Sequence, residues 1–205
     1  MVKEQSKQAV HDFIESARRE FDSQTLEFDY SQIENAAQLI LDVQANGGRI
    51  HITGIGKPGH VSSYIASLMS STGNPCYFLD GTEAYHGSSG QLIEGDVVIA
   101  ISNSGETNEL KTTVTTVKNL GCKLIGVSGN ADSWLALNSD AFLLAHVDAE
   151  GGPLNRAPRN SVIAEMLVLQ ALSVLLQEEK GLDPVEYVRH HPGGKLGQLR
   201  EDEKR

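Results

Sequence analysis

Apolar residues recur at helical spacing in two stretches near the start of the chain. The first stretch contains Val10, Phe13, Ile14, Ala17 and Phe21, and the second contains Ile33, Ala36, Ala37 and Ile40. Residues three and four positions apart lie on the same side of an α-helix. The pattern therefore predicts two amphipathic helices before any strand.

From about residue 49 onward, short apolar runs alternate with helical patterns. A run that is apolar at every position, such as Val97–Ile101, is typical of a parallel strand that helices cover on both faces. We expect strands at residues 49–53, 75–79, 96–102, 123–128 and 141–147. We expect helices at 58–71, 106–120 and 160–179, with a short helical segment near Trp134.

This order of elements predicts an α/β fold. Strands that alternate with helices form a parallel sheet with helices on both sides. We expect a three-layer sandwich with a doubly wound, five-stranded parallel sheet of the flavodoxin-like kind, preceded by the extra N-terminal helices.

The last predicted helix is apolar around much of its circumference. Its apolar residues are Val162, Ile163, Met166, Leu167, Leu169, Leu172, Val174 and Leu175. A helix that is apolar on nearly all sides needs more than one packing partner. The sheet would cover one side, and a second copy of the chain is a candidate for another, which would give a dimer or a tetramer. The alternative is an ordinary core helix.

The length of 205 residues fits one domain spanning 1–205. Within it we expect N-terminal helices at 1–45, the sheet with the long helix at 46–180, and a C-terminal segment at 181–205. The net charge of −10 argues against nucleic acid as a partner, because a phosphate backbone requires a basic surface. A small phosphorylated ligand remains compatible with this charge, because it needs only a local group of donors.

The sequence also predicts where the protein acts. The first residues lack the apolar core of a signal peptide. The most apolar stretch, residues 166–176, is shorter than the ~18–20 residues that a membrane-spanning helix needs. Cys76 and Cys122 lie in apolar runs without the spacing of a redox or metal motif, so we expect two buried free thiols. We therefore expect a soluble cytoplasmic protein without a membrane partner.

A glycine-rich turn follows the first predicted strand. It reads TGIGKPG over residues 53–59, with Thr53, Gly54 and Gly56 before Lys57 and Pro58. Glycines let a backbone approach a ligand closely, and proline suits the first position of a helix. The amides at the start of that helix favour an anion, and Lys57 adds a positive charge.

A second turn, SNSGET over residues 102–107, follows the third predicted strand. It offers the hydroxyls of Ser102, Ser104 and Thr107, the amide of Asn103, and the start of another helix. Hydroxyl and amide donors suit a phosphate group. A plain helix cap is the alternative, because serine and threonine cap many helices.

The two turns would reinforce each other in the predicted sheet. With the strand order 2-1-3-4-5, the first and third strands are neighbours, and ligands bind at the carboxyl ends of such strands. A rival interpretation is a dinucleotide site, because residues 54–59 match G-x-G-x-x-G and Asp80 ends the next strand. A single match of this kind is weak, and it leaves the SNSGET turn unexplained.

Four motifs together carry a family resemblance. They are TGIGKPGH (53–60), GTEAYHG (81–87), SNSGETNEL (102–110) and HPGGKLG (191–197). In this order they resemble the SIS (sugar isomerase) domain of the arabinose-5-phosphate isomerase family, over residues from about 25 to the C-terminus. SNSGE alone indicates the wider superfamily of sugar-phosphate isomerases and sugar-phosphate-sensing regulators. The motifs that contain His86 and His191 resemble those of its aldose–ketose isomerase branch.

The resemblance implies a function and a set of site residues. It implies interconversion of D-arabinose 5-phosphate and D-ribulose 5-phosphate, with no metal or other cofactor required. Phosphate binding falls to Ser102, Ser104 and Thr107, and the polar residues used in catalysis match Lys57, His86, Glu109 and His191. SIS sites are commonly completed by a neighbouring subunit, so the resemblance also implies that a histidine can act from a second copy.

The chain departs from the family pattern in three places. Residues 86–90 read HGSSG where many members have HGDLG, which removes an acidic residue. Residues 151–153 and 158–161 read GGP and PRNS where many members have a Cys-Pro and a Pro-Thr-Ser-Ser run. Longer relatives continue into paired CBS domains, so we expect that regulation to be absent. These differences put the identity of the sugar in doubt more than the type of reaction.

The residue types allow a mechanism for the isomerisation. Glu109 would lie in the first helical turn after SNSGET, where it could move a proton between sugar carbons or simply complement the helix dipole. His86 and His191 are imidazoles in glycine-rich loops that could open the sugar ring or relay protons. Lys57 could pair with the phosphate or with the enediolate.

The sequence gives less information on the remaining histidines and on whether the protein is an enzyme or a sensor. We interpret His60 as structural and assign no role to His11, His51 or His146. A non-catalytic module that senses a sugar phosphate remains the alternative function. A sensor would need the phosphate turn but not the proton-transfer groups, so the presence of both favours the enzyme.

Overall fold

The computed structural model describes residues 1–204. Five parallel strands form one sheet in the order β2-β1-β3-β4-β5. They are β1 (Ile50–Gly54), β2 (Cys76–Phe78), β3 (Val97–Ile101), β4 (Lys123–Ser128) and β5 (Ala141–Leu144). This is the flavodoxin-like order, and it confirms the predicted α/β fold.

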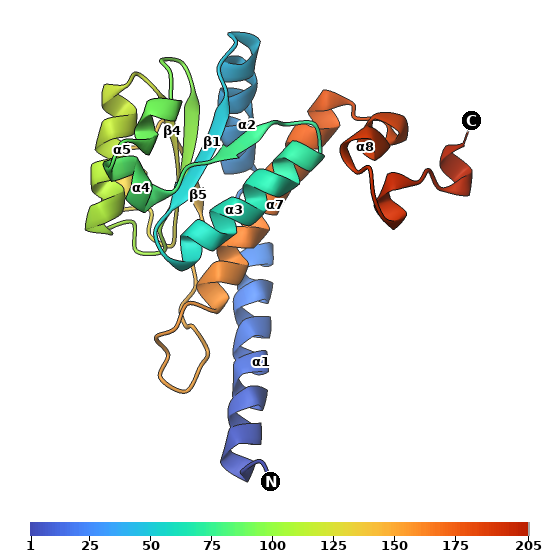
Figure 1. The fold of residues 1–205 in the computed structure, drawn as a ribbon. Coiled ribbons are helices and arrows are strands. Elements are labelled where there is room, and N and C mark those ends of the chain that lie inside the picture. Colours follow the sequence, from blue (N-terminus) through green and yellow to red (C-terminus); the bar gives the residue numbers. More distant parts are fainter. Residues whose placement is uncertain (205) are drawn as a thin grey trace.

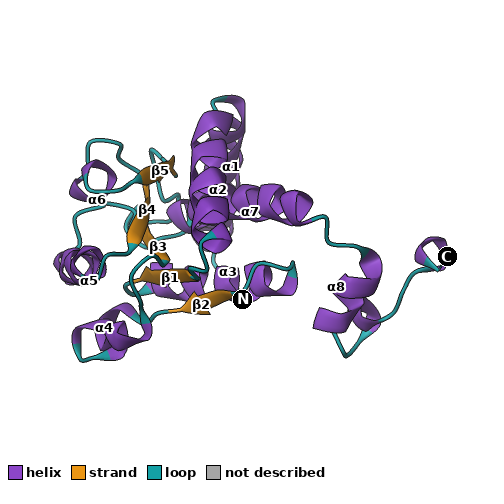
Figure 2. Cartoon of the chain, turned by 90° about the horizontal axis from the view of Figure 1, so that it is seen from above, coloured by secondary structure: helices purple, strands orange, loops and turns teal. Residues whose placement is uncertain are grey.

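Helices cover both faces of the sheet (Figure 2). One face carries α2 (Tyr30–Ala45), α3 (Lys57–Ser71) and α7 (Asn160–Lys180), and the other carries α4 (Gly81–Tyr85), α5 (Asn108–Asn119) and α6 (Trp134–Leu137). A 3₁₀ helix, η1 (Ser88–Gln91), follows α4. The three layers explain why β3, in the middle of the sheet, is apolar at every position.

Two segments extend away from this sandwich (Figure 1). The helix α1 (Glu4–Leu26) packs against α7 near its end, while its first turns project beyond the body. At the other end of the chain, α8 (Pro184–His190), η2 (Lys195–Gly197) and η3 (Glu201–Glu203) lie on the side of the molecule opposite α4 and α5.

Successive strand residues point into two separate cores. Ile52, Ile99 and Val127 belong to the larger core beneath α2, α3 and α7. Val98 and Ala100 point to the opposite face, into the smaller clusters that α4, α5 and α6 cover. Because side chains alternate along a strand, adjacent residues of one strand stabilise different layers.

Some element boundaries differ from those predicted. The helix expected from residue 106 begins at Asn108, because Gly105 has a φ of +65° and Thr107 has an extended backbone. The last strand ends at Leu144 rather than at residue 147, and the ring nitrogen Nδ1 of His146 lies 2.8 Å from the carbonyl oxygen of Gly129. The short helix α4 was not predicted.

The helix α7 is longer than the apolar stretch 166–176 on which the expectation of no membrane-spanning segment rested. By length and composition alone, its 21 residues could cross a bilayer, which corrects that expectation. Half of its most apolar window is buried, and α1, α2 and α3 all pack against it. The core helix of a globular protein meets the same length and composition test. The most exposed large apolar residue of α7 is Val174.

Both cysteines are buried free thiols, as predicted. Burial raises the pKa of Cys76 to about 12 and that of Cys122 to about 11. The thiol of Cys122 donates to the carbonyl oxygen of Ile93 at 3.3 Å. Neither thiol is therefore poised to react near neutral pH.

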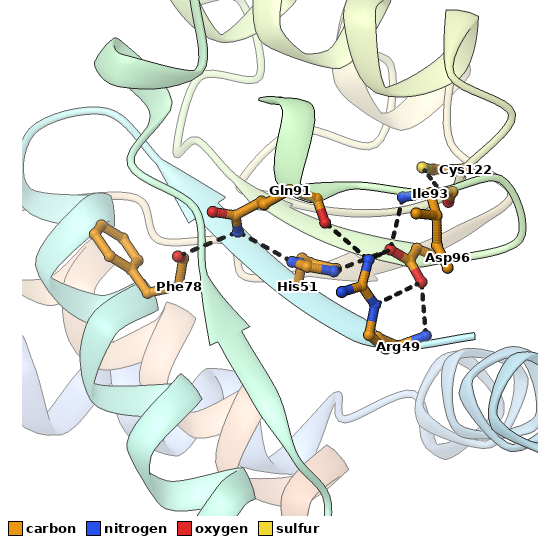
Figure 3. A network of polar contacts seen from close by, with 7 residues as sticks. All are labelled: Arg49, His51, Phe78, Gln91, Ile93, Asp96 and Cys122. Carbon is orange, nitrogen blue, oxygen red and sulfur yellow. Dashed lines mark hydrogen bonds and ion pairs between the residues drawn. The ribbon is translucent and has the colours of Figure 1, made fainter. Parts of the chain in front are cut away.

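A buried polar network joins the starts of β1 and β3 (Figure 3). The carboxylate of Asp96, which is 0% exposed, accepts hydrogen bonds from the backbone and guanidinium of Arg49 at 2.8 Å and from the backbone of Ile93 at 3.0 Å. His51 Nε2 lies 3.1 Å from the same carboxylate, and its Nδ1 lies 3.2 Å from the amide of Gln91. His51, to which the sequence assigned no role, thus holds the amino edge of the sheet.

Burial and hydrogen bonding act in opposite directions on the pKa of Asp96. Burial acts to raise the pKa of Asp96, but hydrogen bonds from Arg49 and from backbone N–H groups outweigh it and keep the pKa below its usual value. Burial lowers the pKa of His51. The network therefore combines an ionised carboxylate with a neutral imidazole near pH 7.

Replacing Asp96 tests this network. Asp96→Ala leaves Arg49, His51 and two backbone donors without their acceptor, and we expect the free energy of unfolding to fall by about 3 kcal/mol or more. In the natural protein, the pKa values of His51 and Asp96 are both lower in the folded state than in the unfolded state. The free energy of unfolding therefore decreases as pH falls, from about pH 6.5 because of His51 and from about pH 4 because of Asp96. Urea unfolding at several pH values measures both effects. Asp132→Ala, an exposed control, should change stability by under ~0.5 kcal/mol.

A second carboxyl group predicts the opposite pH dependence. Glu165 on α7 is 1% exposed, and neither of its side-chain oxygens has a hydrogen-bond partner among the described residues. Burial, followed by the nearby charge of Glu150, raises its pKa to about 8. The folded state therefore favours the protonated form, and stability is lost as pH rises from the unfolded value of about 4.5 through 8.

Glu165→Gln removes this dependence. The variant should match the natural protein in stability at pH 5 and exceed it at pH 9, in thermal unfolding at both pH values. Glu178→Gln, on the exposed part of the same helix, should leave the difference between the two pH values unchanged. An equal difference for both variants would exclude a buried neutral Glu165.

Candidate active site

The two ligand-binding turns predicted from the sequence start from neighbouring strands. Strands β1 and β3 pair directly, and Gly54 at the end of β1 lies opposite Ile101 at the end of β3. The chain passes from there into α3 on one side and into the 102–107 turn and α5 on the other. Both turns therefore lie at the carboxyl edge of the sheet, where parallel sheets bind their ligands.

The first turn is packed so closely that it requires glycine. A Cβ atom at Gly54 would lie 2.8 Å from the carbonyl carbon of Pro58, and one at Gly59 would lie 2.8 Å from the oxygen of Gly54. Gly56, which precedes α3, has a φ of +67°. The end of β1 and the start of α3 thus form one compact unit whose first amide groups carry no side-chain cap.

Thr53 contributes a buried hydroxyl beside this turn. It is 0% exposed, and its Oγ1 has no hydrogen-bond partner among the described residues. A Cβ atom at Gly81, the first residue of α4, would lie 3.2 Å from that oxygen. An unpartnered hydroxyl is costly inside a protein, so this oxygen is a buried acceptor and donor whose hydrogen-bonding capacity is unused at the junction of β1 and α4.

In the second turn, the hydroxyls and the backbone face one another. Ser102 Oγ lies 3.1 Å from Thr107 Oγ1 and accepts a hydrogen bond from the backbone of Gly105 at 3.2 Å. The exposed Ser104 accepts one from the backbone of Glu106 at 3.2 Å. The carbonyl of Asn103 accepts from Gly129 at 2.8 Å, which fastens the turn to the end of β4.

The turn is more than a helix cap. Thr107 occupies the N-cap position of α5, yet its side chain makes no capping hydrogen bond. The first amide groups of α5 therefore remain available, and the partial positive charge of the helix start favours an anion. Since α3 begins at the same edge, two helix starts and three hydroxyls suit one phosphate group.

Beside the turns, α4 and α5 enclose an open pocket of about 460 Å³. His86, which follows α4, and Glu109, in the first turn of α5, both line it. The ring of Tyr85 meets that of His86 edge to face, with centroids 5.3 Å apart. The structure thus brings together two of the four polar residues that the family resemblance implied.

The sequence reasoning missed other residues that line this pocket. They are Gly81, Thr82, Tyr85, Asn108 and Thr112. Asn108 and Thr112 are four residues apart, so their spacing on α5 could have indicated a shared face beside Glu109. Thr82 and Tyr85 could not be placed, because their positions depend on the short helix α4.

Lys57 and His191 do not line this pocket. Lys57 is the exposed first residue of α3, at the carboxyl edge of the sheet. His190, next to His191, reaches the carbonyl of Ser71 at 3.4 Å, at the opposite end of the same helix. The 15 residues of α3 span ~22 Å, so His191 is remote from the other predicted catalytic residues of its own chain.

His191 is instead held within the C-terminal segment. Its ring stacks on that of Tyr187 with centroids 4.1 Å apart, and its Nδ1 lies 3.0 Å from the carbonyl oxygen of Tyr187. Figures 1 and 2 both place this segment on the far side of the sandwich from α4 and α5. In this structure, His191 therefore does not reach the pocket of its own chain.

The acidic residue of the rival dinucleotide interpretation has another partner. Asp80 caps α4 by accepting hydrogen bonds from the backbones of Thr82 and Glu83 at 2.8 and 2.9 Å. Asp80 is thus the N-cap of a short helix, a role that does not depend on a dinucleotide.

Metal binding has little support in the geometry. Among residues 1–204, no three histidine, cysteine, aspartate or glutamate side chains are grouped so that they could hold a metal ion. His86 and Glu109 share a pocket with hydroxyl and amide groups. These residue types suit acid–base chemistry on a polar ligand.

Comparison with known proteins identifies a family and similar folds. The SIS domain matches residues 44–175. An Escherichia coli CFT073 protein solved in complex with arabinose 5-phosphate is 32% identical, with a TM-score of 0.76 over 91% of this chain and 95% of that one. A Listeria monocytogenes protein described as a "putative sugar-phosphate isomerase" is 25% identical, with a TM-score of 0.85 over 94% of this chain and 100% of that one.

Curated relatives are similar over most of this chain. The arabinose 5-phosphate isomerase KdsD of Pseudomonas aeruginosa is 41% identical over 79% of this chain and 49% of its own length. The arabinose 5-phosphate isomerase KpsF of Escherichia coli O6:H1 is 36% identical over 83% of this chain and 51% of its own length. The chain thus spans about half the length of the curated relatives that it matches.

Gly105 provides a test of the second turn. Its φ is +65°, and a Cβ atom there would clash with both the Oγ and the Cβ of Ser133. Gly105→Ala should therefore displace the turn, lower stability by ~1–3 kcal/mol and abolish binding of inorganic phosphate. Calorimetric titration with phosphate and urea unfolding measure the two effects. Gly90→Ala, where nothing lies within 4 Å of the added Cβ, should bind phosphate as the natural protein does.

Proposed function

Because the chain belongs to the SIS-domain family, we propose that it is an aldose–ketose isomerase acting on a sugar phosphate. The substrate that fits best is D-arabinose 5-phosphate, with D-ribulose 5-phosphate as the product and an enediol as the intermediate. One observation carries this proposal: His86 and Glu109 share a pocket beside two turns that suit a phosphate group.

The similar proteins support the choice of substrate. Curated relatives are named arabinose 5-phosphate isomerases, and the Escherichia coli CFT073 relative was solved with that sugar phosphate bound. This chain also contains the hydroxyls and helix starts that such a ligand needs. Ser102, Ser104 and Thr107 would hold the phosphate together with the amides that follow Gly54 and Gly56.

Isomerisation then requires one proton to move between adjacent carbons. Glu109 removes the proton from C2 of the open-chain aldose, and the C–H electron pair becomes the double bond between C1 and C2. A proton placed on O1 completes the enediol. Removal of the proton on O2 and return of a proton from Glu109 to C1 give the ketose, so that no oxidant or reductant is needed.

His86 and Lys57 would assist at the oxygen atoms. An imidazole in the same pocket as the base can protonate and deprotonate O1 and O2, and can open the sugar ring first. Lys57, at the start of α3, would pair with the phosphate or with the negative charge of the enediolate. Neither role requires a metal ion.

Self-association would complete the site. His191 is remote from the pocket of its own chain, and the apolar side chains of Val10, Ile14 and Phe21 on α1 are 61%, 56% and 45% exposed. An apolar stripe on a projecting helix needs a partner, and a second copy of the chain supplies one. We propose a dimer or tetramer in which a neighbour brings His191 to the pocket.

Glu109→Gln tests the proposed base. The amide retains the shape of the side chain but accepts no proton, so kcat should fall at least ~100-fold while binding of the substrate persists. Ser104→Ala should instead raise KM with little change in kcat. The conversion of arabinose 5-phosphate to ketose gives kcat and KM for each variant. Tight binding without turnover in the unmodified protein would support the sensor instead, and full turnover by Glu109→Gln would remove Glu109 from the mechanism.

Mixed oligomers test the contribution of the second copy. Glu109→Gln and His191→Gln should each be nearly inactive alone, because each lacks one of the groups in every site. Co-refolding them should restore measurable turnover, because some sites then receive both groups from different chains. A mixture no more active than its components would place both groups in one chain or exclude one of them.

A further inference from the structure

The phosphate-binding turn is fastened to α6 by contacts that the proposed chemistry does not use. Glu106 Oε1 accepts a hydrogen bond from the backbone of Trp134 at 2.7 Å. The carbonyl of Gly105 accepts one from the backbone of Leu135 at 3.1 Å. Residues 105 and 106 are therefore held against the start of α6, on the side of the turn away from α3.

A lysine completes this contact. Lys111 Nζ lies 2.5 Å from the other carboxylate oxygen of Glu106, and it lies 5.6 Å from the centre of the Trp134 ring. The hydrogen bond from Lys111, followed by that from the Trp134 backbone, lowers the pKa of Glu106. Glu106, Lys111 and Trp134 thus form a small unit that joins the turn, α5 and α6.

The position of Glu106 creates an electrostatic problem. Its carboxylate belongs to the same six-residue turn as the hydroxyls of Ser104 and Thr107, which would hold a phosphate dianion. Like charges separated by several ångströms near a protein surface repel each other by ~1 kcal/mol or more. Glu106 fixes the turn through Trp134, but without a countercharge it would also weaken phosphate binding.

We propose that Glu106 and Lys111 form a charge-neutral staple that positions the phosphate-binding turn. Glu106 supplies the hydrogen bond that holds the turn against α6, and Lys111 cancels the charge that this bond introduces. Both are positioning residues, since neither is required to touch the substrate. The inference rests on the proposed function, because it presumes that a phosphate group docks at the turn.

The geometry separates this role from direct phosphate binding by Lys111. Its amine is engaged with Glu106 and lies near the face of Trp134, which is where cations bind aromatic rings. The two roles predict different results when Glu106 is also replaced. If Lys111 binds phosphate directly, Lys111→Met weakens phosphate binding whether or not Glu106 is charged. If Lys111 only neutralises Glu106, Lys111→Met has little effect on phosphate binding once Glu106 is replaced by Gln.

Four variants test the proposal, with inorganic phosphate as the probe. They are Lys111→Met, Glu106→Gln, the double variant with both changes, and Lys118→Met as a matched control. Lys118 lies on the same helix and donates to the carbonyl of Asn138 near the end of α6 at 2.7 Å, but no acidic side chain within residues 1–204 pairs with it. Trp134 is the only tryptophan in the chain, so its fluorescence reports on the staple directly.

Each variant has a distinct expected result. Lys111→Met should weaken phosphate binding and raise KM about tenfold at low salt, with kcat within about twofold, and added salt should shrink the effect. Glu106→Gln, whose amide oxygen can still accept from Trp134, should bind phosphate at least as tightly as the natural protein. The double variant should return to within about threefold of it, and Lys118→Met should not differ.

Three outcomes would overturn the proposal. A double variant as weak as Lys111→Met would make Lys111 a direct phosphate ligand. Unchanged phosphate binding and KM in Lys111→Met would mean that the charge of Glu106 does not affect the affinity of the turn for phosphate. If the natural protein fails to bind phosphate, the proposed function fails and the staple with it, whereas binding with a different pattern among the variants rejects the staple alone.

Discussion

The direct pairing of β1 with β3 is the constraint on which the rest of this structure depends. It places Gly54 opposite Ile101, so that the two turns leave the sheet side by side. Two helices then start at one edge, and their partial positive charges and free amides suit the same anion. The pocket between α4 and α5 opens beside that edge because α4 follows β2, the other neighbour of β1. A different strand order would separate these groups even if every motif were retained.

Charged side chains secure the sheet at both of its edges, and they do so in different environments. At the amino edge, Asp96 is fully buried and is satisfied by several donors, so the network joins β1 to β3 before either strand begins. At the carboxyl edge, Glu106 is half exposed and links the turn at residues 102–107 to the start of α6. The buried cluster fixes the frame, and the exposed pair acts where a ligand would enter. His51 belongs to the frame and not to the chemistry.

Much of the fold was predictable because it follows from local patterns. The continuous apolar run at residues 97–101 predicted β3, and the helical spacing of apolar residues predicted α2. The largely apolar stretch at 160–179 predicted α7 to within one residue. The pocket was harder to predict, because Tyr85 and Thr82 reach it only through α4, a five-residue helix with no apolar period of its own. The start of α5 was placed too early, since a positive φ at Gly105 is not visible in a hydrophobic pattern. His191 carries a recognisable motif, yet its distance from the pocket depends on contacts between distant parts of the chain.

The close packing of Gly54 against α3 has a consequence for how such a protein can change. No side chain can be added at Gly54 or Gly59 without moving the backbone that would cradle the phosphate. The opposite wall of the pocket is built from side chains on α4 and α5, and Tyr85 is 70% exposed. Adaptation to a longer or differently configured sugar would therefore proceed along that wall, while the grip on the phosphate stayed the same. One scaffold could in this way serve a series of substrates that share only their charged end.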